Sequence, residues 1–287
     1  MNTSFQHSNI PSFHSLLICP ACETALDWNE NACRCANGHS FDPAKEGYLN
    51  LLLSHQRKSN HPGDDANMIQ ARRRFFDSGV FAPLTDLITN AASINRKSEM
   101  SVLDCGCGEG HFLGAVSAAH AGQFYGVDVS KEAVRCAAKR YKKATWIVAN
   151  AMRQLPFADH SLDVILSILA PRNPDEFTRI LKPDGALILG VPGPNHLIEL
   201  RSRLAANAGD FEEKAAEAAV KCAPHFTEAH RDMLSYQQTL SAAQLADLIQ
   251  MTPIFWCSSP EAKAEVQQLN ELTVTVSFVL LSFGVRR

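Results

Sequence analysis

After Ser101, apolar runs of strand length alternate with stretches that have the apolar spacing of helices. Short apolar runs of strand length recur at residues 102–103, 124–127, 146–148, 164–169 and 186–191. Stretches with the apolar spacing of helices separate them, which is typical of a parallel, doubly wound α/β sheet. The closing run, residues 272–283, is rich in Val, Thr and Phe and predicts a last strand.

The first third of the chain has a more broken pattern, with short segments separated by Pro, Asn and Gly. It predicts a helix over residues 66–76, capped by Asp64 or Asp65. An Ala-, Glu- and Lys-rich stretch at residues 197–222 predicts a helical lid or insertion. In chain order we expect a flexible lead-in, a small module, a linker with a helix, and a large domain, at residues 1–15, 16–53, 54–84 and 85–287.

Composition narrows the function classes. The chain has 287 residues, of which 46% are hydrophobic and 20% charged, as in an ordinary globular protein. No apolar run approaches the roughly 18 residues that span a bilayer, and the N-terminus lacks signal-peptide features, so we expect a cytoplasmic protein without membrane contact. The net charge of -3 and the pI near 6.4 exclude nucleic-acid binding through the overall field, and such binding requires a local patch.

Four of the nine cysteines cluster in the small module. Cys19-x2-Cys22 and Cys35-x3-His39 form two knuckles whose thiolates and imidazole suit the tetrahedral coordination of a structural Zn²⁺ ion, one per chain. Cys33 is a rival third ligand, but Cys35 has the better spacing to His39. A module too small for its own core gains stability from such an ion, and four protein ligands leave no open position for catalysis.

A glycine-rich turn follows the first predicted strand of the large domain. Residues 102–110 read Val-Leu-Asp-Cys-Gly-Cys-Gly-Glu-Gly, with the spacing Asp-x-Gly-x-Gly-x-Gly rather than the dinucleotide fingerprint Gly-x-Gly-x-x-Gly. The form resembles the cofactor loop of class I (Rossmann-like) methyltransferases, which use S-adenosylmethionine. That resemblance implies that Gly106, Gly108 and Glu109 line the methionine part of the cofactor, with Asp104 near its amino group.

Further polar residues follow the next strands. Asp128 ends the second strand, where a carboxylate can accept hydrogen bonds from both ribose hydroxyls. Asn150 follows the third strand, at a position where many such enzymes carry an Asp that contacts the adenine amino group. Residues 155–164 resemble a stretch common in the superfamily. Residues 171–174 lie at the carboxyl end of the fourth strand, where we expect the substrate to approach.

Over residues 16–256 the chain resembles the bacterial 23S rRNA (guanine-N1)-methyltransferases of the RlmA type. The resemblance rests on the zinc knuckles and on HSFDPAKEGYLNLL, Gly63-Asp64 with Met68, ARRRF, GVFAPL and PGPNHL, at residues 39–52, 63–68, 71–75, 79–84 and 192–197. It implies methylation of guanine N1 in the hairpin 35 loop of 23S rRNA. It also places His196 and Phe81 against the cofactor, although Phe81 replaces a family Tyr and loses its hydroxyl.

An RNA substrate agrees with further features. The linker pair Arg57-Lys58 and the run Arg72-Arg73-Arg74 are candidates, together with the zinc module, for a positive surface beside the pocket. Guanine N1 lies on the Watson-Crick edge, so the base must be unpaired or flipped out. A homodimer that presents two zinc modules to one RNA is compatible with the sequence.

The sequence leaves the general base open among four side chains, Glu109, Asp163, Asn173 with a water, and His196. It also leaves two rival functions. One is a methyltransferase that acts on a small molecule, because the cofactor domain alone does not fix the substrate. The other is a non-enzymatic RNA-binding protein with a retained methyltransferase scaffold, which the intact glycine loop disfavours.

Overall fold

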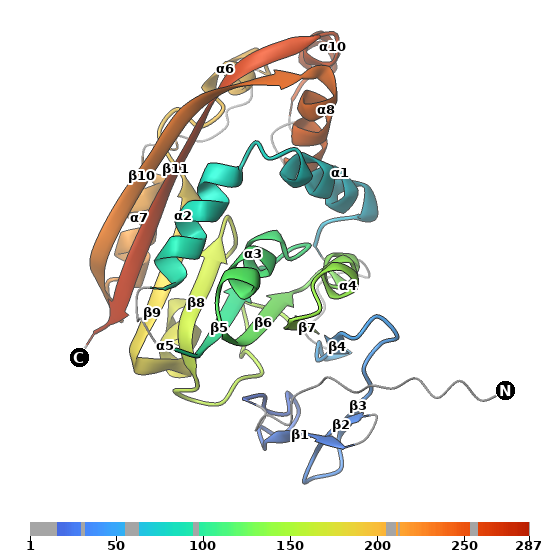
Figure 1. Ribbon diagram of the computed structural model, residues 1–287, viewed down its shortest axis with the longest axis vertical. Coiled ribbons are helices and arrows are strands. Elements are labelled where there is room, and N and C mark those ends of the chain that lie inside the picture. The colour runs from blue at the N-terminus through green and yellow to red at the C-terminus, as the bar shows by residue number, and fades with distance from the viewer. Residues whose placement is uncertain are drawn as a thin grey trace, which may run out of the picture.

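The computed structural model describes residues 16–29, 32–54, 63–93, 98–204, 211, 213–252 and 258–286. An eight-stranded sheet in the order β10-β11-β9-β8-β5-β6-β7-β4 forms its centre (Figure 1). Its strands are β4 (Leu49–Asn50), β5 (Met100–Cys105), β6 (Gly122–Asp128), β7 (Ala144–Val148), β8 (Leu162–Ile168), β9 (Leu181–Pro192), β10 (Phe226–Ser241) and β11 (Glu271–Val285). Strands β4 to β9 pair in parallel, whereas β11 runs antiparallel to both β9 and β10. The doubly wound α/β prediction is confirmed.

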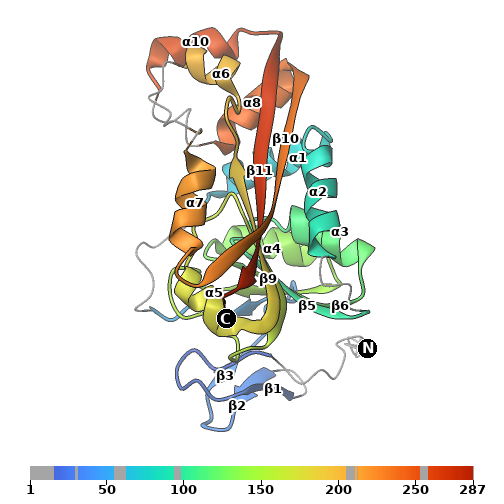
Figure 2. The same ribbon diagram turned by 90° about the vertical axis from the view of Figure 1, so that its left-hand side faces the viewer.

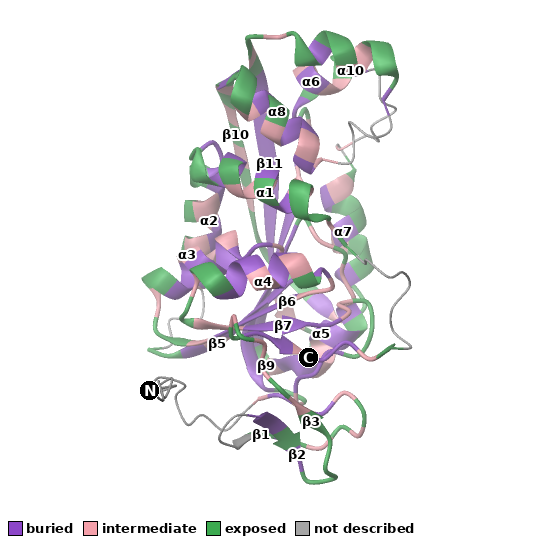
Figure 3. Ribbon diagram, turned by 90° about the vertical axis from the view of Figure 1, so that its right-hand side faces the viewer, coloured by how far each residue is buried: buried purple, intermediate pink, exposed green. Residues whose placement is uncertain are grey.

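Helices cover both faces of this sheet (Figure 2). They are α1 (Ala66–Asp77), α2 (Ala82–Ala92), α3 (His111–Ala119), α4 (Lys131–Arg140), α5 (Pro174–Ile180), α6 (Ile198–Arg203), α7 (Lys214–Cys222), α8 (Ala242–Met251) and α10 (Pro260–Gln267). Successive strand residues point to opposite faces, so Val102 packs in the core with α1 to α4 and α8, and Leu103 packs in the core with α5 and α7. Strands buried on both faces make up most of the interior (Figure 3).

The predicted apolar strands all form. All seven residues of β8 are buried, which explains why this strand has a continuous apolar run rather than an alternating pattern. Helix α1 starts after Asp65, whose side chain accepts a hydrogen bond from the backbone N–H of Met68 at 2.9 Å, so Asp65 and not Asp64 is the cap. Within the predicted helical stretch 197–222, the structure describes α6 and α7.

The long strand β10 was not predicted. It pairs with β11 from Phe226 opposite Val285 to Ser241 opposite Glu271. Only the two ends of β10 carry fully buried residues, Phe226 and Leu240, because the strand lies at the edge of the sheet. Its polar sequence therefore gives no apolar run, and the partner strand holds it in place through backbone hydrogen bonds.

The small module packs against the large domain below the sheet in Figures 1 and 2. It contains a three-stranded sheet of β1 (Leu26–Asn29), β2 (Ala32–Cys35) and β3 (Ser40–Phe41). The backbone N–H of Ile18 donates to the carbonyl of Pro156 at 3.0 Å, and Leu17 bridges to Phe157. Both Leu17 and Phe157 are fully buried in one apolar cluster. The module is therefore packed against the domain and is not connected to it by the linker alone.

The chain leaves the module through β4, which adds an edge strand to the main sheet beside β7. Helix α1 begins near the carboxyl end of β6, where the Ser130 hydroxyl donates to the carbonyl of Asp64. None of the helices in the described ranges is both long and apolar enough to cross a membrane. In Figure 1 the module lies below the parallel strands β5 to β7, whereas α1 lies above them.

Candidate functional site: a zinc cluster and a cofactor loop

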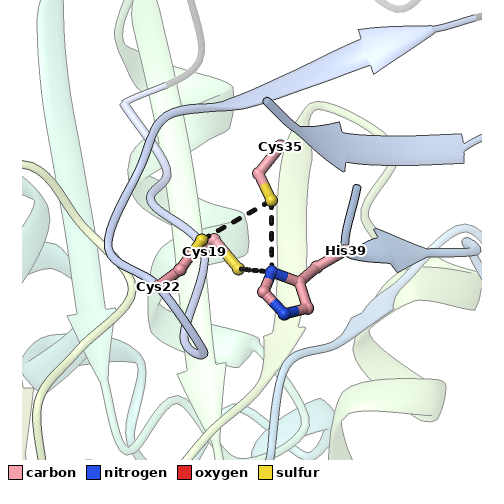
Figure 4. Close-up of side chains that lie close together, drawn as sticks. All are labelled: Cys19, Cys22, Cys35 and His39. Atoms are coloured by element: carbon pink, nitrogen blue, oxygen red, sulfur yellow. Dashed lines mark hydrogen bonds between the residues drawn. The ribbon is translucent and has the colours of Figure 1, made fainter. Parts of the chain in front are cut away.

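The three cysteines and the histidine of the predicted zinc site converge in the small module (Figure 4). Their ligand atoms all lie within 4.8 Å of one another. Cys19 Sγ lies 3.5 Å and Cys35 Sγ 3.3 Å from His39 Nδ1, and Cys22 Sγ lies 3.6 Å from Cys35 Sγ. Zn–S bonds of about 2.3 Å and Zn–N bonds of about 2.0 Å place tetrahedral ligands roughly 3.5–3.8 Å apart, so the cluster fits Zn²⁺.

The surroundings of the cluster favour a bound cation. Hydrogen bonds from Thr24 lower the pKa of the Cys22 thiol to about 5, so this ligand is a thiolate at neutral pH. Burial raises the pKa of Cys19 to about 11, and a metal ion supplies the charge that ionises such a thiol. Cys33 stands outside the cluster in the apolar core, where burial raises its pKa to about 11. Cys35 is therefore the third cysteine ligand.

The glycine-rich turn links β5 to α3 at the carboxyl end of the sheet. Gly106, Gly108 and Gly110 have positive φ angles of 85°, 54° and 86°, which side-chain-bearing residues rarely adopt. The backbone N–H groups of Gly106 and Cys107 donate to the carbonyl of Val127 on β6. A Cβ on Gly106 would lie 2.4 Å from the Cβ of Ala170. The turn is thus held tightly against β6 and the chain that follows β8.

Two aspartates, the buried Asp104 and the half-buried Asp128, stand at this turn. The Oδ2 atom of Asp128 accepts the Gly108 N–H at 2.9 Å, and its Oδ1 accepts the Ser130 N–H at 2.8 Å. Burial raises the pKa of Asp128, and these two bonds oppose the rise. Asp104 is almost fully buried, and its Oδ2 has no hydrogen-bond partner within the described ranges. Burial and then the nearby Asp128 charge raise its pKa to about 7.

These groups fit S-adenosylmethionine. The orphaned Asp104 oxygen suits the ammonium group at the methionine end, because a bound cation satisfies it and offsets its burial. Each Asp128 oxygen keeps further acceptor capacity for a ribose hydroxyl. The absence of a Cβ on Gly106 and Gly108 lets a ligand approach the backbone of the turn closely. The chemistry of this donor set therefore matches the cofactor that the sequence predicts.

Glu109 lies on the same turn, buried, with one carboxylate oxygen, Oε1, lacking a partner in the described part of the chain. Burial raises its pKa to about 7, and the positive charges of Arg140 and Arg72 oppose this rise. Asn150 follows β7, and its Oδ1 accepts the backbone N–H of Met152 at 3.0 Å. Both residues lie at the carboxyl ends of the parallel strands, as predicted.

Phe81 and His196 join one buried aromatic cluster. Their ring centroids lie 6.3 Å apart, and Phe278 packs against both, at 5.1 Å and 4.4 Å respectively. His196 Nδ1 accepts the backbone N–H of Ser277 at 3.1 Å, and burial lowers the pKa of the ring to about 4. Neutral His196 therefore carries its proton on Nε2 and can donate a hydrogen bond there rather than take up a proton.

The interpretation of Asp163 as a general base is wrong. Asp163 stands at the amino end of β8, at the opposite end of the sheet from the glycine turn. Its Oδ2 accepts hydrogen bonds from the Ser101 N–H and the Lys182 Nζ, both at 2.9 Å. These partners join β5, β8 and β9, so the side chain is structural. Among the four candidates, Glu109 and Asn173 remain, since His196 acts as a donor.

The arginine run does not join the zinc cluster, and Arg57-Lys58 lies outside the described residues. Arg74 pairs with Asp247 on α8 at 2.5 Å, and Arg73 lies 4.0 Å from Asp77. Arg72 instead points at the glycine turn, where its Nη1 lies 3.4 Å from the position that a Cβ on Gly108 would take. The sequence could not predict that Arg72 contacts the glycine turn, because the two segments are far apart in the chain and only the tertiary structure brings them together.

Comparisons with known proteins agree with both sites. Residues 102–185 match the family model of a methyltransferase domain, and residues 17–60 match the model of the RlmA N-terminal zinc ribbon. Fold, glycine turn and zinc cluster define a class I S-adenosylmethionine-dependent methyltransferase with a zinc ribbon.

Three relatives match nearly the whole chain. The 23S rRNA (guanine(748)-N(1))-methyltransferase of Streptomyces fradiae is 34% identical over 92% of this chain and 95% of its own. The putative 23S rRNA (guanine-N(1)-)-methyltransferases of Micromonospora griseorubida and Bacillus subtilis are 34% and 32% identical, each over 93% of this chain and 96% of their own. The chain belongs to the family of RlmA-type 23S rRNA (guanine-N1)-methyltransferases.

Proposed function

We propose that this protein methylates N1 of a guanine in the hairpin 35 loop of 23S rRNA. The observation that carries the proposal is membership of the family over both parts of the chain, the zinc ribbon and the methyltransferase domain. A small-molecule methyltransferase has no evident use for a docked zinc module. In this proposal residues 16–53 contact the RNA, residues 85–287 carry the chemistry, and residues 54–84 connect them, in the cytoplasm.

The cofactor site lies at the glycine turn. Gly106, Gly108 and Glu109 line its methionine end, Asp104 faces the ammonium, and Asp128 faces the ribose. Asn150 stands beside the adenine, and two rings close the pocket, Phe81 just before α2 and His196 in the turn after β9. The bound cofactor supplies an electrophilic methyl group on a good leaving group. The protein therefore contributes mainly position, because in-line geometry accounts for much of such an acceleration.

The guanine must leave its stack before its N1 atom can reach the methyl group. The chain between β8 and α5 stands at the carboxyl end of the sheet, where open α/β sheets bind substrates. Guanine N1 also loses a proton. Glu109, with a pKa of about 7, and Asn173 through a water are the candidates that the geometry leaves, and Asn173 makes no capping hydrogen bond on α5.

Within one chain, the zinc module lies below the parallel strands β5 to β7 and α1 lies above them (Figure 1). An RNA hairpin that contacts both a zinc module and the cofactor pocket is therefore more easily bound between two copies of the chain. We propose a homodimer for this reason. Light scattering on the purified protein, alone and with the hairpin, measures the stoichiometry, and a one-to-one complex that methylates at full rate contradicts the dimer.

Primer extension tests the reaction directly. The protein is incubated with S-adenosylmethionine and unmodified 23S rRNA, and reverse transcription maps the product, because a methyl group on N1 blocks Watson-Crick pairing. We expect a new stop in the hairpin 35 loop. A hairpin with the loop guanines replaced by adenine is the control, and it should give no stop. Cofactor binding without any stop on folded, unmodified RNA supports the small-molecule alternative instead.

A further inference from the structure

The linker that precedes α1 lies directly against the cofactor loop. A Cβ on Gly63 would lie 2.9 Å from the Cβ of Ser130, the residue whose backbone N–H donates to Asp128. The Ser130 hydroxyl in turn donates to the carbonyl of Asp64 at 2.9 Å. These contacts fix Asp64 beside the carboxyl end of β6, although it lies more than sixty residues away in the sequence.

Arg72 extends from α1 over the same loop. Its Nη1 atom lies 2.5 Å from Asp64 Oδ2 and 3.4 Å from the position of a Cβ on Gly108. Its side chain is only 22% exposed, whereas that of Arg74 is 58% exposed. The positive charge of Arg72 also acts on Asp128 and Glu109, where it opposes the rise in pKa that burial causes. Arg72 is thus a cation of the cofactor loop rather than of the outer surface.

The loop needs such a cation. Asp104, Glu109 and Asp128 are three carboxyl groups around the turn, and they suit the ammonium and sulfonium groups of S-adenosylmethionine. The methionine end also carries a carboxylate, which these acids would repel. A guanidinium has five N–H donors, so the bond to Asp64 leaves others free for a second, bidentate partner.

We propose that Arg72 binds the carboxylate at the methionine end of S-adenosylmethionine and that Asp64 positions its guanidinium over Gly108. The proposal rests on the cofactor and is independent of which RNA is methylated. It assigns Arg72 to the cofactor pocket and removes it from the RNA-binding surface that the sequence run Arg72-Arg73-Arg74 predicted. It also makes the linker, and not only the Rossmann-like domain, a part of the cofactor site.

Two ligands that differ at the methionine end test this assignment by calorimetry without RNA. S-adenosylhomocysteine carries the carboxylate, whereas 5′-methylthioadenosine keeps the nucleoside and lacks the whole amino-acid portion. We expect Arg72→Ala to weaken S-adenosylhomocysteine binding by about 10- to 100-fold, the usual loss of a charge-assisted hydrogen bond, and to leave methylthioadenosine within about twofold of wild type. Unchanged S-adenosylhomocysteine affinity overturns the proposal, and so does an equal loss for both ligands.

Arg73→Ala is the matched control. Arg73 is adjacent on α1 and 38% exposed, and it lies 4.0 Å from Asp77, so both affinities should stay at the wild-type level. Asp64→Asn tests the positioning role, with an expected loss of about three- to tenfold for S-adenosylhomocysteine alone. If Arg72→Ala does not fold, Arg72→Lys keeps a charge and a long side chain but loses the planar fork. Arg72→Lys should still bind S-adenosylhomocysteine more weakly than wild type does, with methylthioadenosine binding unchanged. Wild-type affinity for S-adenosylhomocysteine in Arg72→Lys overturns bidentate binding.

Discussion

The zinc module and the cofactor loop are both built from short, cysteine- and glycine-containing segments, yet they are organised in opposite ways. The four metal ligands all come from residues 19–39, and the metal ion holds them together. The groups at the cofactor loop come from the linker, α1, β5, β6 and the turn after β9, and the hydrophobic core holds those elements in place. One site is local in sequence and depends on its ligand, whereas the other is assembled by the fold before the ligand arrives.

This difference predicts how each region responds to damage. Loss of one zinc ligand should unfold a small region and leave the large core intact. A small change of shape at the glycine turn should leave the fold and the zinc in place but remove the cofactor. Experiments that separate these two responses test whether the regions are as independent as their construction suggests.

The largest effect is expected from Cys22→Ser. Structural zinc contributes on the order of 10 kcal/mol to the folding of small zinc modules, so the variant should lose its zinc and its RNA methylation. Cofactor affinity should stay within about threefold, because the glycine turn packs against β6 and not against the module. Metal analysis, calorimetry with S-adenosylhomocysteine, and primer extension measure the three properties.

The matched control is Cys33→Ser, which replaces a buried cysteine of the same module that stands outside the cluster. It should keep a full equivalent of zinc. Zinc retention in Cys22→Ser together with zinc loss in Cys33→Ser would show that the ligand set is wrong. Full methylation by a zinc-free protein would break the link between the module and the RNA.

The second prediction compares two glycines with the same backbone angle, one in each region. Gly38 and Gly106 both have φ of 85°, but a Cβ on Gly38 meets no atom within 4 Å, whereas one on Gly106 lies 2.4 Å from the Cβ of Ala170. Gly38→Ala should cost only about 1 kcal/mol of stability through backbone strain. Gly106→Ala should displace the turn and weaken S-adenosylhomocysteine binding by about 100-fold or more. Equal cofactor affinities in the two variants contradict the assignment of the turn.

The same difference explains what the sequence could and could not predict. The zinc ligands were predictable because their spacing alone brings them together. The strands β5 to β9 were predictable because burial on both faces produces apolar runs, as in β8. Edge strand β10 was missed because water covers much of its outer side and its sequence is polar. A feature was therefore predictable where a short stretch of sequence determines it, and was missed where it depends on a distant partner.

Residues that the fold brings together from distant segments were less predictable. Asp163 belongs to a superfamily-like stretch and was a candidate base, but its strand direction places it at the amino end of β8 beside Lys182. Arg72 looked like one of three equivalent arginines, yet helix geometry turns successive side chains by about 100°, so the three face different partners. Only the packing of α1 against α4 and α8 separates their roles.

The third prediction concerns pH and only the cofactor region. The pKa of Asp104 is about 7 in the ligand-free protein, and an ammonium bound beside it favours the ionised form. Binding therefore releases a proton below pH 7, and affinity for S-adenosylhomocysteine should rise about tenfold between pH 6 and pH 8. Calorimetry at three pH values measures this rise, with zinc content checked at each. A flat profile in wild type, or an unchanged slope in Asp104→Asn, contradicts the role of Asp104.

The smallest effect on function is expected from Asp163→Asn. This variant tests whether every buried acid of the sheet contributes to activity or only those at the glycine turn. The change removes the ion pair with Lys182, which is 35% exposed and can be solvated, so the free energy of unfolding should fall by only about 1–2 kcal/mol. Methylation and cofactor affinity should stay within about twofold of wild type, because Asp163 lies at the far end of β8. Urea unfolding and primer extension measure the two quantities. A tenfold loss of methylation at unchanged stability would return Asp163 to the catalytic candidates, and would mean that the two ends of the sheet are coupled.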